Sequence, residues 1–254
     1  MKRTSGKVYL VGAGPGAPDL ITLRGAEVLR RADVVFHDAL VHPEVLALAS
    51  SAEKIAVGKR CGKFTTAQQF INKRLVDAAR KYCVVVRLKG GDPMLFGRAQ
   101  EEIAALEAAA VPYEVVPGVT SALAAAAEAG VSLTQRGVAR SVAFVTPRVG
   151  EGEASSNWAS SAASADTAVI YMGAGQAEQV AAALIAAGAP RDLPVLVTEN
   201  ATLPQARRIA LTLEELPQIA RYGITGPTLI MVGRAFAAAL SAFEQEAQRQ
   251  YAGG

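Results

Sequence analysis

The sequence has few cysteines, few histidines and no long apolar run, and each shortage argues against a class of protein. The 254 residues contain only two cysteines, Cys61 and Cys83, which are too few for a disulfide framework. His37 and His42 have no cysteine or histidine at ligand spacing, so we expect no metal site. No apolar segment reaches the length of a membrane-spanning helix, and the charged N-terminus precedes only a short apolar run. We therefore expect a soluble, cytoplasmic protein with no membrane partner.

An excess of one charge is also absent. The 26 Lys and Arg residues face 23 Asp and Glu residues, which gives a formal net charge of +3 at pH 7. No stretch gathers five or more like charges, as the basic arms of nucleic-acid-binding proteins do. This balance predicts no nucleic-acid partner. With 51% hydrophobic residues the chain is able to bury a normal core, and a small molecule is the expected substrate.

The sequence does contain a regular alternation of β-branched apolar runs and amphipathic segments, which predicts a mostly parallel sheet covered by helices. The expected strands of the first half are 8–11, 34–37, 55–57, 84–88 and 113–116, and the expected helices are 20–32, 43–49, 67–81, 99–109 and 119–129. Residues 130–137 have no helical period, and a second α/β block follows from Val142. The fold class is therefore α/β with two domains, 1–135 and 136–254, each a sheet covered by helices.

One long segment of the second block has no clear period. Residues 148–166 are rich in Ser, Ala, Gly and Glu, and this composition predicts a mobile surface loop. Trp158 within it is expected to anchor the loop by local packing, and a role as a lid over a substrate stays open.

Two apolar strands end in glycine-rich loops, and this repetition points to a ligand site. After the strand 84–88, Gly90 and Gly91 remove side-chain bulk, so that a ligand can approach the backbone. Asp92 next to them is able to accept hydrogen bonds from hydroxyl or amino groups, and Arg98 follows near the start of the next helix. One such loop is good turn chemistry and nothing more. The second, residues 12–19, favours a binding function.

The second loop also matches a dinucleotide-binding pattern. Residues 12–17 fit GxGxx(G/A) after a strand, with Asp33 or Asp38 as the acid for a ribose, which would indicate an NAD-dependent oxidoreductase. Pro15 and Pro18 oppose this interpretation, because they delay the helix whose N-terminus would face a pyrophosphate. An NAD enzyme and a non-catalytic anion-binding module remain as alternatives.

Six segments together resemble the motifs of uroporphyrinogen-III C-methyltransferases, within the wider tetrapyrrole-methylase superfamily. They are 11–22, 37–41, 58–62, 90–93, 116–122 and 171–173, and segment 198–207 favours the same branch. The chain departs from the family pattern at His37, where a tyrosine is usual, and at Gln135, where a histidine is common.

The resemblance implies a two-domain homodimer with S-adenosyl-L-methionine in a cleft between the domains and S-adenosyl-L-homocysteine as product. The implied reaction is methylation of uroporphyrinogen III at carbons 2 and 7, giving precorrin-2 through precorrin-1 on the route to sirohaem and cobalamin. Another precorrin methyltransferase activity is the alternative within the superfamily. The implied cofactor residues are Pro15, Gly90, Gly91, Asp92, Leu95, Thr120, Ser121, Met172 and Ala201, and the implied substrate residues are Arg98, Glu101, Arg136 and Met172.

The chemistry of this reaction ranks the implied catalytic residues Asp38, Lys59 and Arg98. Methyl transfer to an electron-rich pyrrole carbon depends mainly on positioning. The methylated macrocycle is cationic and must lose a proton from a bridging methylene, so a proton acceptor is needed. Lysine and arginine are poor bases at neutral pH, and we therefore favour Asp38 as acceptor, with Lys59 as the family's donor. Arg98 and Arg136 are suited to bind the substrate's carboxylates through their guanidinium forks.

Overall fold

A computed structural model describes residues 6–57, 64–150, 154 and 156–242, and the side chains of 64–67 are not part of that description. The chain divides into two compact units, Met1–Ser121 and Ala122–Gly254. This division lies before the predicted boundary at 135/136. The reason is that the alanines of the helix Ser121–Ala129 (α5) pack in the core of the second unit, with Leu196, Met231 and Phe236.

The first unit is built on a five-stranded sheet in which every strand pair is parallel, as the alternation of strands and helices predicts. The strand order is β3-β2-β4-β1-β5, which places β1 and β4 side by side in the middle. The strands are β1 (Lys7–Gly12), β2 (Val34–His37), β3 (Glu53–Ala56), β4 (Val84–Lys89) and β5 (Tyr113–Val116).

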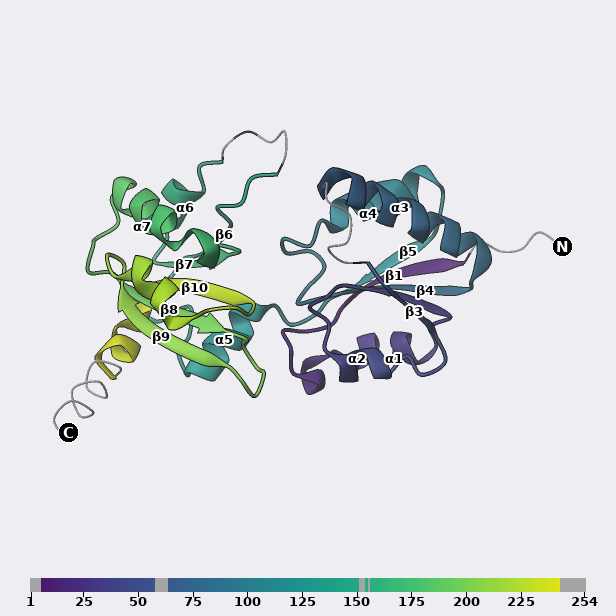
Figure 1. The fold of residues 1–254 in the computed structure, drawn as a ribbon, viewed down its shortest axis with the longest axis horizontal. Helices are drawn as coiled ribbons and strands as arrows, with labels where there is room; N and C mark the ends of the chain where they lie inside the picture. The colour runs from purple at the N-terminus through teal and green to yellow at the C-terminus, as the bar shows by residue number, and fades with distance from the viewer. Residues whose placement is uncertain (1–5, 58–63, 151–153, 155, 243–254) are drawn as a thin grey trace. The chain divides into compact units, whose positions relative to one another are not determined.

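Helices cover both faces of this sheet (Figure 1). The pair α1 (Leu23–Arg30) and α2 (Pro43–Ala47) lies on one face, and α3 (Phe64–Lys81) and α4 (Ala99–Ala108) lie on the other. Because side chains alternate along a strand, Val8 packs in the core under α3 and α4, whereas Tyr9 packs against α1 and α2. The chain thus leaves the adjacent strands β1 and β4 toward opposite faces.

The second unit has a mixed sheet of order β6-β7-β10-β8-β9, in which β6 pairs parallel with β7 and the other pairs are antiparallel. Its strands are β6 (Val142–Val145), β7 (Thr167–Tyr171), β8 (Pro194–Glu199), β9 (Arg207–Thr212) and β10 (Thr228–Gly233). The helices α6 (Trp158–Ser164) and α7 (Ala177–Ala186) pack on one face, and α5 packs on the other. Four short 3-10 turns complete the described elements, η1 (Pro18–Leu20), η2 (Ala174–Gln176), η3 (Leu216–Tyr222) and η4 (Arg234–Phe236).

Two sequence predictions about individual elements are wrong. Residues 148–166 are not one loop, because α6 forms inside them, with Ala162 buried and Trp158 packed against the core. The helix expected at 20–32 begins only at Leu23, where the Thr22 hydroxyl caps it by accepting from the Gly25 N–H at 3.1 Å. Serine-rich and alanine-rich composition resembles a loop, but three alanines in the seven residues of α6 also suffice for a short helix that packs against the core.

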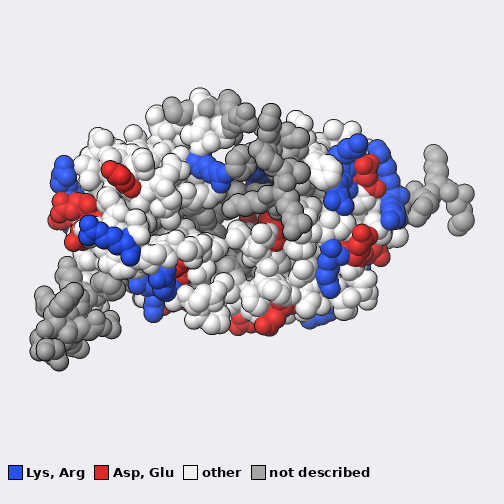
Figure 2. Space-filling model, viewed as in Figure 1, with Lys and Arg blue, Asp and Glu red and all other residues white. Residues whose placement is uncertain are grey.

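Charges on the first unit are balanced locally. Figure 2 shows Lys and Arg side chains beside Asp and Glu side chains on the displayed face of this unit. Glu114, for example, binds Lys7 at 2.7 Å and Arg24 at 2.5 Å.

Among the helices of the described residues, none is long and apolar enough to cross a membrane.

Candidate functional site

Three glycine-rich loops meet where β1, β4 and β5 end. A Cβ atom on Gly118 would lie 2.4 Å from the Gly91 carbonyl oxygen and 2.8 Å from the Gly12 Cα. The backbones of Gly14 and Gly91 are joined by a short bridge, with the Gly91 N–H donating to the Gly14 carbonyl at 2.7 Å. Only residues without side chains allow the loops to stack this closely.

This meeting point coincides with the topological switch point of the sheet. The strands β1 and β4 are neighbours, and their following helices, α1 and α4, lie on opposite faces (Figure 1). In open α/β sheets, ligands bind outside the carboxyl ends of strands at such a point. The position of this unit's predicted cofactor residues at the ends of β1, β4 and β5 agrees with that rule.

Gly91 differs from its two neighbouring glycines. Its φ of +66° lies in the left-handed region, and a Cβ atom there would have only the Thr120 Cα nearby, at 4.0 Å. Contacts therefore force glycine at 12 and 118, whereas backbone conformation favours it at 91. The side of Gly91 that a side chain would occupy is open, and it faces Thr120.

Asp92 has a structural task that sequence reasoning missed. Its Oδ2 accepts from the Gly118 N–H at 2.8 Å, and its Oδ1 accepts from the Met94 N–H, also at 2.8 Å. Both carboxylate oxygens thus tie the loops after β4 and β5 together. The remaining predicted cofactor residues of this unit, Pro15, Gly90, Leu95, Thr120 and Ser121, are all partly exposed, the first four on the same three loops and Ser121 at the start of α5.

Strained backbone is concentrated in the predicted loops. Six non-glycine residues among those described have positive φ. Five of them follow a strand of the predicted site, and the sixth, Ala110, follows α4. The five are Phe96, Arg98, Met172, Asn200 and Thr202. Such conformations cost about 1–3 kcal/mol each and are common at functional sites.

A buried network of charges lies beneath the loop after β4. Arg87 and Lys89 share one face of β4, and both side chains are only 4% exposed. Glu102 of α4 is fully buried; it accepts from the Arg87 Nε at 2.9 Å and from the Lys89 Nζ at 3.0 Å. Gln68 of α3 also donates to Glu102, at 3.3 Å. The sequence signal was available, because two cations at positions i and i+2 interrupt an apolar run.

The environment shifts the pKa values of the two cations in opposite directions. Burial opposes the charge of Arg87, but Asp38 and Glu102 outweigh it, and the pKa of Arg87 is raised. Burial and the nearby Arg87 charge together lower the pKa of Lys89, despite its contact with Glu102. Arg87 is therefore the fixed charge of the network.

Asp38, the predicted proton acceptor, lies at the edge of this network. It follows β2, and its Oδ1 accepts from an Arg87 terminal nitrogen at 2.6 Å. Its side chain is 28% exposed, whereas Arg87 is buried. Arg87 is thus held inside the unit, and the Asp38 carboxylate that it orients remains accessible to a ligand.

Arg98, the predicted substrate-binding and rival catalytic residue, has its guanidinium group occupied. Its Nε donates to Glu101 Oε1 at 2.6 Å and a terminal nitrogen donates to Oε2 at 2.7 Å. Glu101 is itself a predicted substrate residue, so the structure brings these two together. Lys59, the third predicted catalytic residue, lies outside the described residues.

The remaining predicted residues belong to the second unit. Met172 follows β7 and is 43% exposed, and Ala201 follows β8 and is buried. Arg136 is exposed and lines an open pocket of about 430 Å³. Arg140 lines the same pocket, which places two guanidinium-bearing residues around one hollow.

The loop that carries Ala201 is held by a buried carboxylate. Glu199, at the end of β8, accepts from the N–H groups of Thr225 at 2.7 Å and Gly226 at 2.6 Å. Its other oxygen accepts from the Arg207 Nε at 2.8 Å. Burial opposes this charge, but the hydrogen bonds from Gly226, Thr225 and Arg207 outweigh it and lower the pKa of Glu199.

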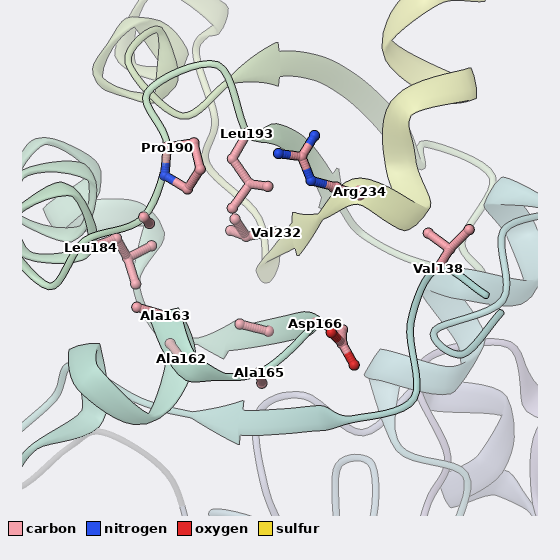
Figure 3. Close-up of a pocket in the computed structure, with 12 residues that line it drawn as sticks. Val138, Ala162, Ala163, Ala165, Asp166, Leu184, Pro190, Leu193, Val232 and Arg234 are labelled. Atoms are coloured by element: carbon pink, nitrogen blue, oxygen red, sulfur yellow. The ribbon is translucent and has the colours of Figure 1, made fainter. Parts of the chain in front are cut away.

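The second unit also contains a small apolar pocket of about 150 Å³ (Figure 3). Alanine and aliphatic side chains line most of it, and Asp166 and Arg234 are its only charged lining residues. None of the predicted site residues in the described part of the chain lines this pocket. It is therefore separate from the candidate site.

Comparison with known proteins identifies the family. The family described as Tetrapyrrole (Corrin/Porphyrin) Methylases matches residues 7–217, well over half of the chain. The chain belongs to the tetrapyrrole methylases. The recognition made from the six sequence segments is thus confirmed, and the family is one of methyltransferases.

A curated relative and two solved structures are similar to the chain. Siroheme synthase of Nitrosococcus oceani is 46% identical over 230 residues, which cover 90% of this chain and 49% of that protein. The chain thus spans about half the length of the curated relatives it matches. The native uroporphyrin III C-methyl transferase of Thermus thermophilus is 41% identical with a TM-score of 0.81, covering 92% of this chain and 100% of that one. The same enzyme complexed with S-adenyl homocysteine has a TM-score of 0.79 at 41% identity, covering 91% and 93%. The predicted two-domain fold is confirmed.

Proposed function

We propose that the chain uses S-adenosyl-L-methionine to methylate uroporphyrinogen III at carbons 2 and 7, giving precorrin-2 through precorrin-1. The observation that carries this proposal is the coincidence of the topological switch point with the open side of Gly91. The chain is similar to a uroporphyrin III C-methyl transferase over 92% of its own residues and all of that enzyme's, which supports the substrate class. Precorrin-2 formation would serve sirohaem or cobalamin synthesis, and we propose a homodimer as the working form.

The glycine-rich loops suit this cofactor better than a dinucleotide. The segment after β1 passes through the three-residue 3-10 turn η1 before α1 begins at Leu23, so no α-helix N-terminus directly follows Gly12–Ala17 to face a pyrophosphate. S-adenosyl-L-methionine carries no phosphate and supplies an electrophilic methyl group. The backbone around Gly91 and the side chains of Thr120 and Ser121 would hold it in the first unit. Met172 and Ala201 remain proposed cofactor residues of the second unit.

Asp38 is proposed as the group that accepts the proton. Addition of a methyl group to a pyrrole carbon leaves the macrocycle cationic, and loss of a methylene proton restores neutrality. Asp38 is accessible and paired with the buried Arg87, which orients the carboxylate. The substrate's eight carboxylates need cations, and Arg98 and Arg136 supply exposed guanidinium groups.

The test is an anaerobic assay of the purified protein with uroporphyrinogen III and S-adenosyl-L-methionine, followed by mass analysis of the products. We expect products that carry first one and then two added methyl groups. Asp38→Asn should lower kcat by about 10²–10⁴-fold, the usual contribution of a general base. It should leave cofactor affinity nearly unchanged, since Asp38 acts on the tetrapyrrole.

Two results would contradict these assignments. A wild-type protein that binds S-adenosyl-L-methionine but methylates no tetrapyrrole would refute the proposed substrate. Full turnover in Asp38→Asn would transfer the acceptor role to another group. Retained cofactor binding in the variant shows that its fold survives the loss of the Arg87 pairing.

A further inference from the structure

The Glu101 carboxylate binds the Arg98 guanidinium group in the way that a free carboxylate ligand would. Two nearly equal contacts, 2.6 and 2.7 Å, join the guanidinium edge to the two carboxylate oxygens. This two-pronged arrangement is the way in which arginine binds free carboxylates. The Arg98 side chain is 42% exposed and that of Glu101 is 48% exposed, so solvent and solutes reach the pair.

Helical spacing alone does not explain this geometry. Asp77 and Arg80 on α3 form another exposed pair three residues apart, and they share a single contact of 3.2 Å. Arg98 instead has left-handed backbone, with φ of +57°, immediately before α4 starts. Its position is therefore strained, and Phe96 in the same loop, with φ of +52°, is strained as well.

Glu102, the next residue along the chain, supports the loop before α4 from inside the unit. Glu102 is fully buried and binds Lys89, whose side-chain Cε lies 3.1 Å from the place that a Cβ atom on Gly97 would take. The loop before α4 is thus held from inside by Glu102. Glu101 points outward and has Arg98 as its described side-chain partner, so its carboxylate is free to be exchanged for another.

We propose that Glu101 is a specificity-determining residue, an internal competitor that fills the carboxylate site of Arg98 until a carboxylate of the tetrapyrrole displaces it. This inference rests on the proposed function. Displacement costs the Arg98–Glu101 contacts, so a molecule must gain more than one carboxylate contact to bind well. A macrocycle with eight carboxylates meets that condition, whereas small monocarboxylates of the cell do not.

The test measures the dissociation constant of uroporphyrin III, the stable oxidised octacarboxylate, by fluorescence titration with S-adenosyl-L-homocysteine present. Four proteins form a double-mutant cycle: wild type, Glu101→Gln, Arg98→Gln and the double variant. Glu101→Gln should bind about two- to fivefold more tightly than wild type, the range expected for an exposed ion pair. In the Arg98→Gln background the same change should have no effect.

Asp77→Asn provides the matched control, because it also removes a carboxylate from an exposed pair of the same spacing. It should leave the affinity for uroporphyrin III unchanged. Equal or weaker binding by Glu101→Gln would overturn the proposal, as would tightening that persists without Arg98, which would mean simple charge repulsion. A wild-type protein that methylates uroporphyrinogen III and yet fails the cycle refutes only this inference. A wild-type protein without that activity refutes the proposed function, and the inference with it.

Discussion

Among the described residues, each unit buries one carboxylate beside its predicted binding loops, but the two carboxylates have different partners. Glu102 in the first unit is fully buried and binds two side-chain cations, Arg87 and Lys89. Glu199 in the second unit is 2% exposed and binds two backbone N–H groups and the half-exposed Arg207. The first carboxylate neutralises charges inside the protein, and the second fastens a loop.

This difference predicts different consequences of losing each charge. Removal of one partner from a buried ionic network leaves uncompensated charges behind, and these are expensive. Backbone N–H groups carry no net charge and Arg207 is half exposed to solvent, so the loss of the Glu199 charge costs mainly hydrogen bonds. The first unit should therefore depend on its carboxylate more than the second unit does.

The largest expected effect is that of Glu102→Gln. This change leaves Arg87 and Lys89 without a buried anion between them, and we expect a loss of about 3–5 kcal/mol in the free energy of unfolding. Urea titration measures it as a lower midpoint at unchanged slope. The adjacent Glu101→Gln is the control, since Glu101 is half exposed and its loss should cost no more than about 1 kcal/mol. Equal effects of the two changes would contradict the network.

A smaller effect is expected for Glu199→Gln. Because hydrogen bonds to a charged group contribute about 1.5–3 kcal/mol, we expect a loss of that order at pH 7. The pKa of Glu199 lies below its usual 4.5 in the folded protein, so its charge stabilises the fold above about pH 4.5. That contribution is lost as the pH falls through the lowered value.

Unfolding midpoints measured from pH 7 to pH 3 test the direction of this pH dependence of stability. The wild type should lose stability faster than Glu199→Gln below about pH 4.5, because the amide has no charge to lose. The exposed Glu214 supplies the control Glu214→Gln, which should follow the wild-type curve. A variant curve parallel to that of the wild type would show that Glu199 is not the fastening group.

The sequence was sufficient to predict the alternating architecture, because β-branched runs and amphipathic segments have distinct periods. It was also sufficient to predict two glycine-rich loops, after β1 and β4, which the structure joins through the bridge between Gly14 and Gly91. Local sequence patterns did not predict the features that depend on packing between elements. The unit boundary depends on which core α5 joins, and α6 depends on a buried alanine face that resembles a loop in composition.

Sequence reasoning failed most at the buried charges. Arg87 was predicted only as part of the strand 84–88 and Lys89 as the start of the following loop, and no pairing was predicted for Glu102 or Glu199. Their partners lie far away in sequence or on another element, and only the fold reveals the pairing. The structural bond from the Gly118 N–H to Asp92 was missed for the same reason, since it spans 26 residues, and the cofactor role of Asp92 stays a prediction.

The measurement that tests the central claim most directly is the affinity of Gly91→Ala for S-adenosyl-L-homocysteine, determined by calorimetry. Gly130 supplies a matched control, because its φ of +65° equals the +66° of Gly91 within a degree, and a Cβ there meets nothing within 4 Å. Both changes should cost about 1–2 kcal/mol of stability through backbone strain. Only Gly91→Ala should weaken cofactor binding, by about tenfold or more, because its methyl group enters the space assigned to the ligand. Unchanged affinity in a folded Gly91→Ala protein, or an equal loss in Gly130→Ala, would contradict a cofactor site at the glycine-rich ends of β1, β4 and β5.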